Sequence, residues 1–264
     1  MSTAVAPDLS SRHAPPLGGF NLTALRLEVR RILRNRRTML FTLILPVVFF
    51  LIFGLNKAYA RQPLANGNES AAIMISMALY GGVLATTAGG AMVSIERAEG
   101  WSRQLRLTPL SPVAYIIIKM LTAMVLGLGS VVAVFVVGRA SGVPHLDGVL
   151  WIGCGLSVWV GSLVFAAYGL FMGYLLPTEN VMQILSFTLV LFAFGGGLFI
   201  PLSQFSHTLQ TIAEYTPLYG LSQLVHAPVL GHGVHLVWVV NAVAWLVIFA
   251  GGAVWRFRKD TARV

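Results

Sequence analysis

Six apolar runs, each long enough to cross a bilayer, divide the chain and are separated by short polar segments. They lie at about 39–55, 71–95, 113–137, 149–176, 181–200 and 236–255. A helix needs about 20 apolar residues to cross the hydrocarbon layer. A backbone in lipid must satisfy its own hydrogen bonds, and the alternating pattern of a membrane barrel is absent, so each run is expected to be a helix. The pattern predicts an all-α integral membrane protein with six transmembrane helices.

The composition supports this class. Of the 264 residues 56% are hydrophobic and 10% are charged, and the mean hydropathy is +0.78. A soluble domain carries about 25% charged residues. A water-soluble globular protein, a disordered chain and a fibrous repeat are therefore excluded. The single cysteine, Cys154, excludes an intramolecular disulfide.

The basic residues are distributed asymmetrically. In a six-span arrangement, 15 of the 18 lysines and arginines fall on one side, before the first run, between the second and third, and after the last. This bias predicts that both termini are cytoplasmic in the cell membrane. It also explains the net charge of +9 without nucleic acid. Residues 30–60 resemble a signal peptide ending at Ala60, but the length of the apolar run favours retention as the first span.

The N-terminal segments are expected to lie in the cytoplasm. Residues 1–19 contain several prolines and predict a flexible tail. Residues 20–37 predict an amphipathic interfacial helix that Asn21 could cap. Its arginines, including Arg30 and Arg34, would face anionic headgroups or a protein partner. A simple topology anchor is the alternative. Residues 256–264 form a second cytoplasmic tail.

The loop at 95–109 is the most charged segment between spans. Glu99 and Arg103 are four residues apart and could pair on a helix, and Trp101 and Leu105 have the same spacing and present an apolar knob. Pro109 would end this helix. The pattern favours docking into a cleft of another protein. The alternative is a solvated loop whose tryptophan lies among the headgroups.

Two spans carry semi-polar faces. In the fifth, residues recurring every three or four positions could line a path or hold helices together: Asn180, Gln183, Ser186, Val190 and Phe194. In the second, Gly81, Ala85 and Gly89 predict close helix packing. The adjacent Thr86 and Thr87 are assigned to the path. Pro46 is expected to kink the first span.

Residues 201–235, on the outer side, contain one acid, Glu214, and leucines and phenylalanines at helical spacing. They predict a re-entrant pair of short helices broken at Pro217.

Catalytic chemistry is sparse. The chain has no phosphate-binding glycine loop followed by lysine, so ATP would have to be hydrolysed elsewhere. No carboxylate lies in the middle of a span, which disfavours ion-coupled transport. Lys119 is expected to extend to the interface. No metal or cofactor site is predicted. The alternatives are a lipid-modifying membrane enzyme and an ion-coupled carrier or channel.

The chain resembles the permease subunit of the type-2 ABC exporters between residues 20 and 255. The match rests on six spans after an amphipathic helix, on Glu96-Arg97-Ala98-Glu99-Gly100 leading to Thr108-Pro109-Leu110-Ser111, and on Gly195-Gly196-Gly197-Leu198-Phe199-Ile200-Pro201 before Tyr215-Thr216-Pro217-Leu218-Tyr219. Trp101 and Arg103 depart from the family's usual threonine and acid.

The resemblance implies a non-catalytic permease in an ATP-driven exporter of drugs, lipids or glycolipids. Two permeases, identical or related, would pair above two cytoplasmic ATPase subunits that bind ATP and Mg²⁺. The residues assigned to ATPase contact are Arg30, Arg34, Glu96, Arg97, Glu99, Gly100, Trp101, Arg103 and Leu105. Those assigned to an outer gate are Gly197, Phe199, Pro201, Tyr215 and Pro217.

Overall fold

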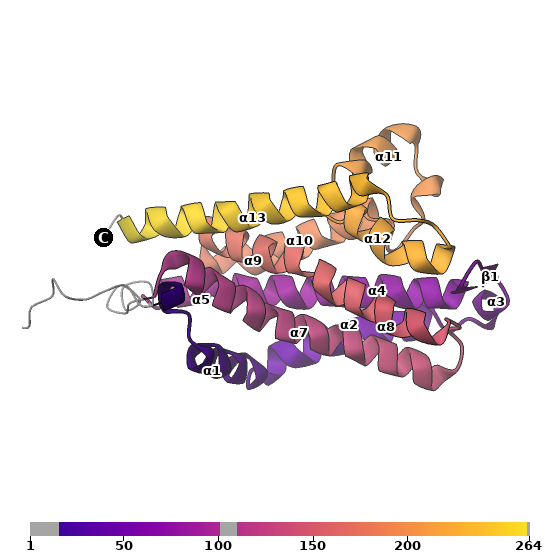
Figure 1. Cartoon of the computed structure of the whole chain (residues 1–264), viewed down its shortest axis with the longest axis horizontal. Helices are drawn as coiled ribbons and strands as arrows, with labels where there is room; N and C mark the ends of the chain where they lie inside the picture. The colour runs from indigo at the N-terminus through magenta and orange to yellow at the C-terminus, as the bar shows by residue number, and fades with distance from the viewer. Residues whose placement is uncertain (1–15, 101–109, 263–264) are drawn as a thin grey trace, which may run out of the picture.

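The computed structural model describes residues 16–100 and 110–262, which form a bundle of long helices lying side by side (Figure 1). The helix η2 (Pro16–Gly19) and the C-terminal end of α13 lie at one end of the bundle, called here the terminal end. The opposite end is called the far end. The long helices are α2 (Arg36–Phe53), α4 (Glu69–Ala91), α7 (Pro112–Ser141), α8 (Gly148–Gly161), α9 (Leu163–Leu175), α10 (Thr178–Gly195) and α13 (Leu236–Ala262).

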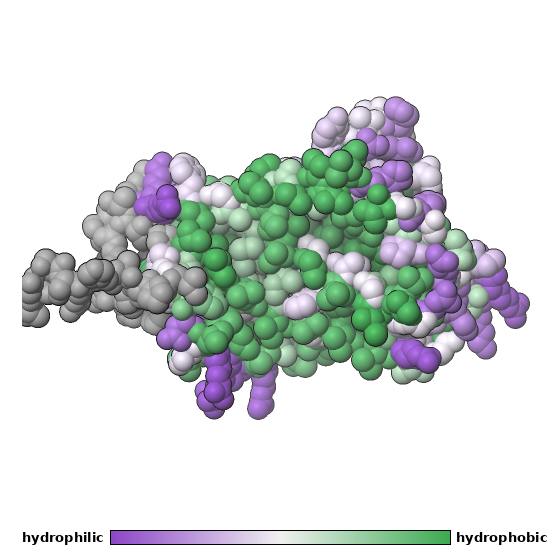
Figure 2. Space-filling view, in the orientation of Figure 1, coloured by the Kyte–Doolittle hydropathy of each residue, from purple (hydrophilic) through white to green (hydrophobic). Residues whose placement is uncertain are grey.

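All six predicted spans are helical. Five helical stretches are long and apolar enough to cross a membrane: Glu69–Ala98, Val113–Ser141, Gly148–Leu175, Thr178–Gly195 and Leu236–Lys259. The first span is shorter, because its apolar part covers only Met39–Phe53. Figure 2 shows an apolar band across the middle of the bundle and polar residues near its ends. The protein is therefore a mostly helical, multi-pass membrane protein.

The predicted amphipathic helix and first span meet at a break. Helix α1 (Leu22–Leu33) ends three residues before α2 begins at Arg36, so the helix predicted over 20–37 is shorter than expected. Asn21 caps α1 as predicted, because its side chain accepts a hydrogen bond from the backbone N–H of Thr23 at 2.7 Å.

Helix α4 forms the centre of the bundle. The other chain segments bury 78% of its spanning window, against 11% for α13. The predicted small-residue packing is confirmed. A Cβ on Gly89 would lie 3.0 Å from Cα of Ala123 on α7, and one on Gly90 would lie 2.5 Å from the Ala166 carbonyl oxygen on α9. Glycines therefore allow α4 to approach the backbones of two helices.

Pro46 leaves a carbonyl in α2 without its usual helical donor, because proline has no N–H. The freed carbonyl is that of Thr42, and the hydroxyl of Ser130 on α7 donates to it at 2.9 Å. Gly81 of α4 completes this contact, since a Cβ there would lie 2.5 Å from Ser130 Oγ. A polar backbone group in the membrane is thus satisfied by a neighbouring helix.

The far end is closed by a small cap made of α3 (Lys57–Ala60) and of β1 (Pro63–Leu64) paired antiparallel with β2 (Gly67–Asn68). Asn68 is buried at its centre. The Asn68 oxygen accepts from the backbone N–H groups of Ala71 and His145, both at 3.0 Å, and its amide donates to the Val143 carbonyl at 2.9 Å. One side chain therefore joins the start of α4 to the loop between α7 and α8.

We expect Asn68→Ala to destabilise the protein by about 2–4 kcal/mol, because it removes a helix cap and leaves buried backbone groups without partners. Thermal unfolding of the purified protein in detergent measures the loss. Asn66→Ala is the control: Asn66 is exposed, and its side chain donates only to the Pro228 carbonyl, at 2.8 Å. Equal stability losses in the two variants would contradict the central role of Asn68.

The predicted re-entrant segment forms η3 (Leu202–Gln204), α11 (His207–Glu214) and α12 (Tyr219–Leu230) at the far end. The break between α11 and α12 contains Pro217, as predicted. Helix α12 packs inward against α4, where His226 and Ser76 are hydrogen-bonded at 2.9 Å. Helix α11 instead exposes Leu209 and Ile212. Only one of the two short helices is therefore integrated into the core.

Candidate coupling site at the terminal end of the bundle

Five polar side chains from three helices meet near the terminal end, and we call them the charge cluster. The members are Glu28 and Arg31 on α1, Glu96 on α5 (Val93–Ala98), and Tyr115 and Lys119 on α7. Lys119 Nζ lies 2.6 Å from Glu96 Oε1 and 2.8 Å from Glu28 Oε2. Arg31 pairs with Glu96 and lies 3.1 Å from Glu28. Tyr115 donates its hydroxyl to Glu96 Oε2 at 2.5 Å.

The cluster is electrically balanced, with two carboxylates and two cations. Glu96 and Lys119 are only 4% and 5% exposed. Burial of an isolated charge is costly, and pairing together with hydrogen bonds offsets that cost. Burial opposes the charge of Arg31, but the hydrogen bond to Glu96 and the nearby negative charges of Glu96 and Glu28 together outweigh burial and raise the pKa of Arg31 above its ordinary value. Arg31 is therefore held in its charged form.

Arg97 makes a second connection. Its guanidinium donates to the carbonyls of Gly173 and Tyr174 at 3.1 and 2.8 Å. These carbonyls lie at the C-terminal end of α9, where the last turn has no internal donors and a cation is favoured. The segment Glu96–Arg97 thus joins α1 and α7 on one side and α9 on the other.

Two of the residues that were predicted to contact the ATPase instead make contacts inside this chain. Glu96 is buried and its carboxylate is used inside the chain, so it does not present a charge at the surface. Arg97 is half-buried against α9. The Lys119 ammonium, which was expected to extend to the interface, is held by two carboxylates of this chain. Arg30, Arg34 and Glu99 are exposed, as a docking surface requires.

Gly100 has a positive φ of 76°, and a Cβ there would meet none of the described residues within 4 Å. Trp101, Arg103 and Leu105 lie outside the described residues, as do Thr108 and Pro109, and their docking role stays a prediction.

The sequence analysis did not assign Glu28, Arg31 or Tyr115 to a site. A signal for the pairing was present, because Glu28 is the only acid in the amphipathic helix and Lys119 is the only lysine in any of the six apolar runs. An ionisable residue in a span generally has a partner. The sequence did not show that α1 and α7 lie close enough in the fold for these residues to pair.

The predicted translocation path divides into two parts. On α10, Asn180, Gln183, Ser186, Val190 and Phe194 are all exposed and share one face. Thr86 and Thr87 are buried, which corrects their assignment to a path. The hydroxyl of Thr86 donates to the Ser162 carbonyl at 3.1 Å, so these threonines hold α4 against the α8–α9 segment.

The residues assigned to an outer gate follow the end of α10. Gly197 adopts a positive φ of 70°, and the next N–H, that of Leu198, donates to the Ala193 carbonyl at 3.0 Å. Phe199 then packs on the ring of Tyr80, with centroids 5.1 Å apart. Pro217 is buried, whereas Pro201 and Tyr215 are exposed. The turn therefore anchors α10 to α4, and its role as a gate stays a prediction.

The family model of the ABC-2 type transporter matches residues 21–227, from the N-cap of α1 to the last turn of α12. The chain belongs to the ABC-2 type transporter family. It is also similar to the putative transport permease YvfS of Bacillus subtilis (strain 168), with 30% identity over 194 residues that cover 73% of this chain and 78% of that protein.

Membership in the ABC-2 family gives the chain its biochemical class. It is a permease component, a non-catalytic transmembrane subunit, and permeases of this family pair with ABC ATPase subunits.

Proposed function

We propose that this chain is the membrane-spanning half of an exporter that moves amphiphilic substrates outward, with ATP and Mg²⁺ bound by a separate ATPase subunit. The terminal end would face the cytoplasm, as the distribution of basic residues predicts. The charge cluster carries the proposal: it links an interfacial helix, the segment after α4 and the spanning helix α7. A push on α1 or α5 would therefore reach α7 directly.

The exposed face of α10 supports an amphiphilic substrate. Its exposed face carries amides near the terminal end, at Asn180 and Gln183, and apolar side chains further on, at Val190 and Phe194. Such a face suits molecules with a polar group and an apolar body. We propose that it lines a path completed by a second permease, either another copy of this chain or a related one.

Glu99→Lys tests the contact with the ATPase. Glu99 is exposed at the end of α5, and reversal of one interfacial charge is expected to reduce ATP-driven transport about tenfold. Export of a fluorescent amphiphile from proteoliposomes that contain the permease and its ATPase subunit measures the effect.

The control for this variant is Glu214→Lys, which reverses an exposed charge at the far end and should leave transport unchanged. Export by the permease alone, without nucleotide, would contradict the proposed function. Normal ATP-driven transport in Glu99→Lys would contradict the assigned contact surface.

A further inference from the structure

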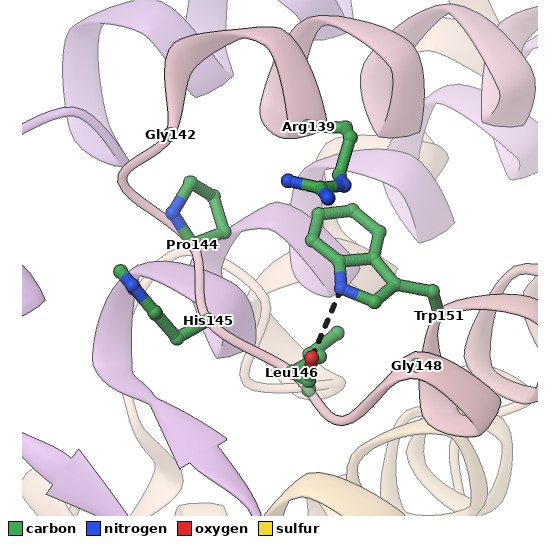
Figure 3. A pocket seen from close by; sticks show the side chains of 7 residues that line it. All are labelled: Arg139, Gly142, Pro144, His145, Leu146, Gly148 and Trp151. Carbon is green, nitrogen blue, oxygen red and sulfur yellow. Dashed lines mark hydrogen bonds between the residues drawn. The ribbon is translucent and has the colours of Figure 1, made fainter.

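A cavity of about 500 Å³ lies at the far end, between the C-terminal turn of α7 and the first turns of α8 (Figure 3). Its walls include Arg139, Pro144, His145 and Trp151. Figure 3 shows the guanidinium of Arg139 lying over the indole of Trp151, at the opening between α7 and the loop. The cavity is separate from the charge cluster and from the exposed face of α10.

Arg139 is held in place without a charge partner. Its guanidinium carbon lies 5.9 Å from the centre of the Trp151 ring, a cation–π contact. The indole is fixed in turn, because its N–H donates to the Leu146 carbonyl at 3.1 Å and its ring packs on Phe135. Among the residues that the structure describes, no carboxylate lies within 4.0 Å of the Arg139 guanidinium.

The start of α8 adds to the positive potential of the cavity. Gly148, the first residue of this 14-residue helix, lines the wall, and the side chain of Asp147 does not cap the helix. The positive end of the α8 dipole therefore lies beside the cavity and favours an anion. Asp147, the only acid between Arg139 and Trp151, is exposed and does not line the cavity.

The depth of Arg139 matches the membrane boundary. Lys119 and Arg139 are the only charged residues of α7. They are 20 residues apart, about 30 Å along a helix, which equals the thickness of the hydrocarbon layer. Because Lys119 lies in the charge cluster near the terminal end, Arg139 is placed at the level of the phosphate groups of the opposite leaflet.

The surface below the cavity is apolar. On α7, Val132 and Val136 share a face with Arg139 and are exposed, and α8 exposes Val149 and Ile152 in its first two turns. A cation above an exposed apolar surface is complementary to a phospholipid. The phosphate would lie at Arg139 and the acyl chains along α7 and α8.

We propose that the cavity lined by Arg139 and Trp151 binds the phosphate of an anionic glycerophospholipid, in the outer leaflet under the orientation proposed above. Arginine recognises phosphate through paired, charge-assisted hydrogen bonds, which the exposed edge of this guanidinium is free to make. The lipid would join α7 to the loop that Asn68 holds at the far end.

Titration of the purified full chain in nonionic detergent with short-chain phosphatidylglycerol tests the site, with binding followed by calorimetry. We expect Arg139→Gln to weaken binding about tenfold and Arg139→Lys to weaken it less, because lysine keeps the charge but loses the paired geometry. Arg61→Gln, which removes an exposed far-end arginine away from the cavity, should bind like the unaltered protein.

Three further ligands separate the sources of the phosphate. Short-chain phosphatidylcholine should bind more weakly than phosphatidylglycerol, and glycerol phosphate and inorganic phosphate should be weaker still, because they lack chains to contact α7 and α8. Equal binding of inorganic phosphate and the lipid would overturn the lipid assignment. Unchanged lipid binding by Arg139→Gln, or an equal loss in Arg61→Gln, would overturn the site.

Discussion

Glu96→Gln is expected to cost about 3–5 kcal/mol of stability and to abolish ATP-driven transport, because it removes a carboxylate from the buried Lys119 and leaves the charge cluster with a net positive charge. Glutamine is nearly isosteric with glutamate, so the loss of stability is caused by removal of the charge and not by a change in packing. The free energy of unfolding in detergent measures the first effect, and transport by the protein reconstituted with its ATPase measures the second.

Glu96→Gln/Lys119→Gln separates charge imbalance from loss of contacts. It removes one charge of each sign, and Glu28 and Arg31 remain as a pair at 3.1 Å. We expect this double variant to be more stable than Glu96→Gln alone. Glu99→Gln, three residues away and exposed, should change stability by no more than about 0.5 kcal/mol. A double variant less stable than Glu96→Gln would contradict the balanced-charge account.

Gly169→Ala is expected to destabilise the bundle by about 3 kcal/mol, the upper part of the range for an overpacked core. A Cβ on Gly169 would lie 2.2 Å from the Thr87 carbonyl oxygen, and this atom belongs to the backbone of α4, so it cannot rotate away. The backbones of α4 and α9 would have to separate. Thermal unfolding in detergent measures the change.

The matched control for Gly169→Ala is Gly251→Ala in α13. Gly251 also lies in an apolar helix, but a Cβ there would meet nothing within 4 Å. Alanine has a higher helix propensity than glycine, so this variant should be neutral or slightly stabilising. If the two variants lost equal stability, the close approach of α4 and α9 would not explain the effect.

The sequence predicted the six helices because the bilayer imposes a length and an apolar composition on each span. It also predicted the Asn21 cap, the close packing at Gly81 and Gly89, and the two short helices after α10, all of which depend on local pattern. Side-chain polarity was a poorer guide. Thr86 and Thr87 were assigned to a path, but their hydroxyls satisfy carbonyls between packed helices.

The sequence by itself determined the class of the protein and the positions of its six apolar helical stretches, because both follow from hydropathy along a single chain. It also identified an unusual charge in each of two separate segments, Glu96 and Lys119. Only the tertiary structure decided that these charges pair with each other and with α1, and that Arg139 lies over Trp151. The physical reason is that a charge in a membrane protein is stable only beside its partner, and the partner is chosen by how helices pack across distances that no local pattern records.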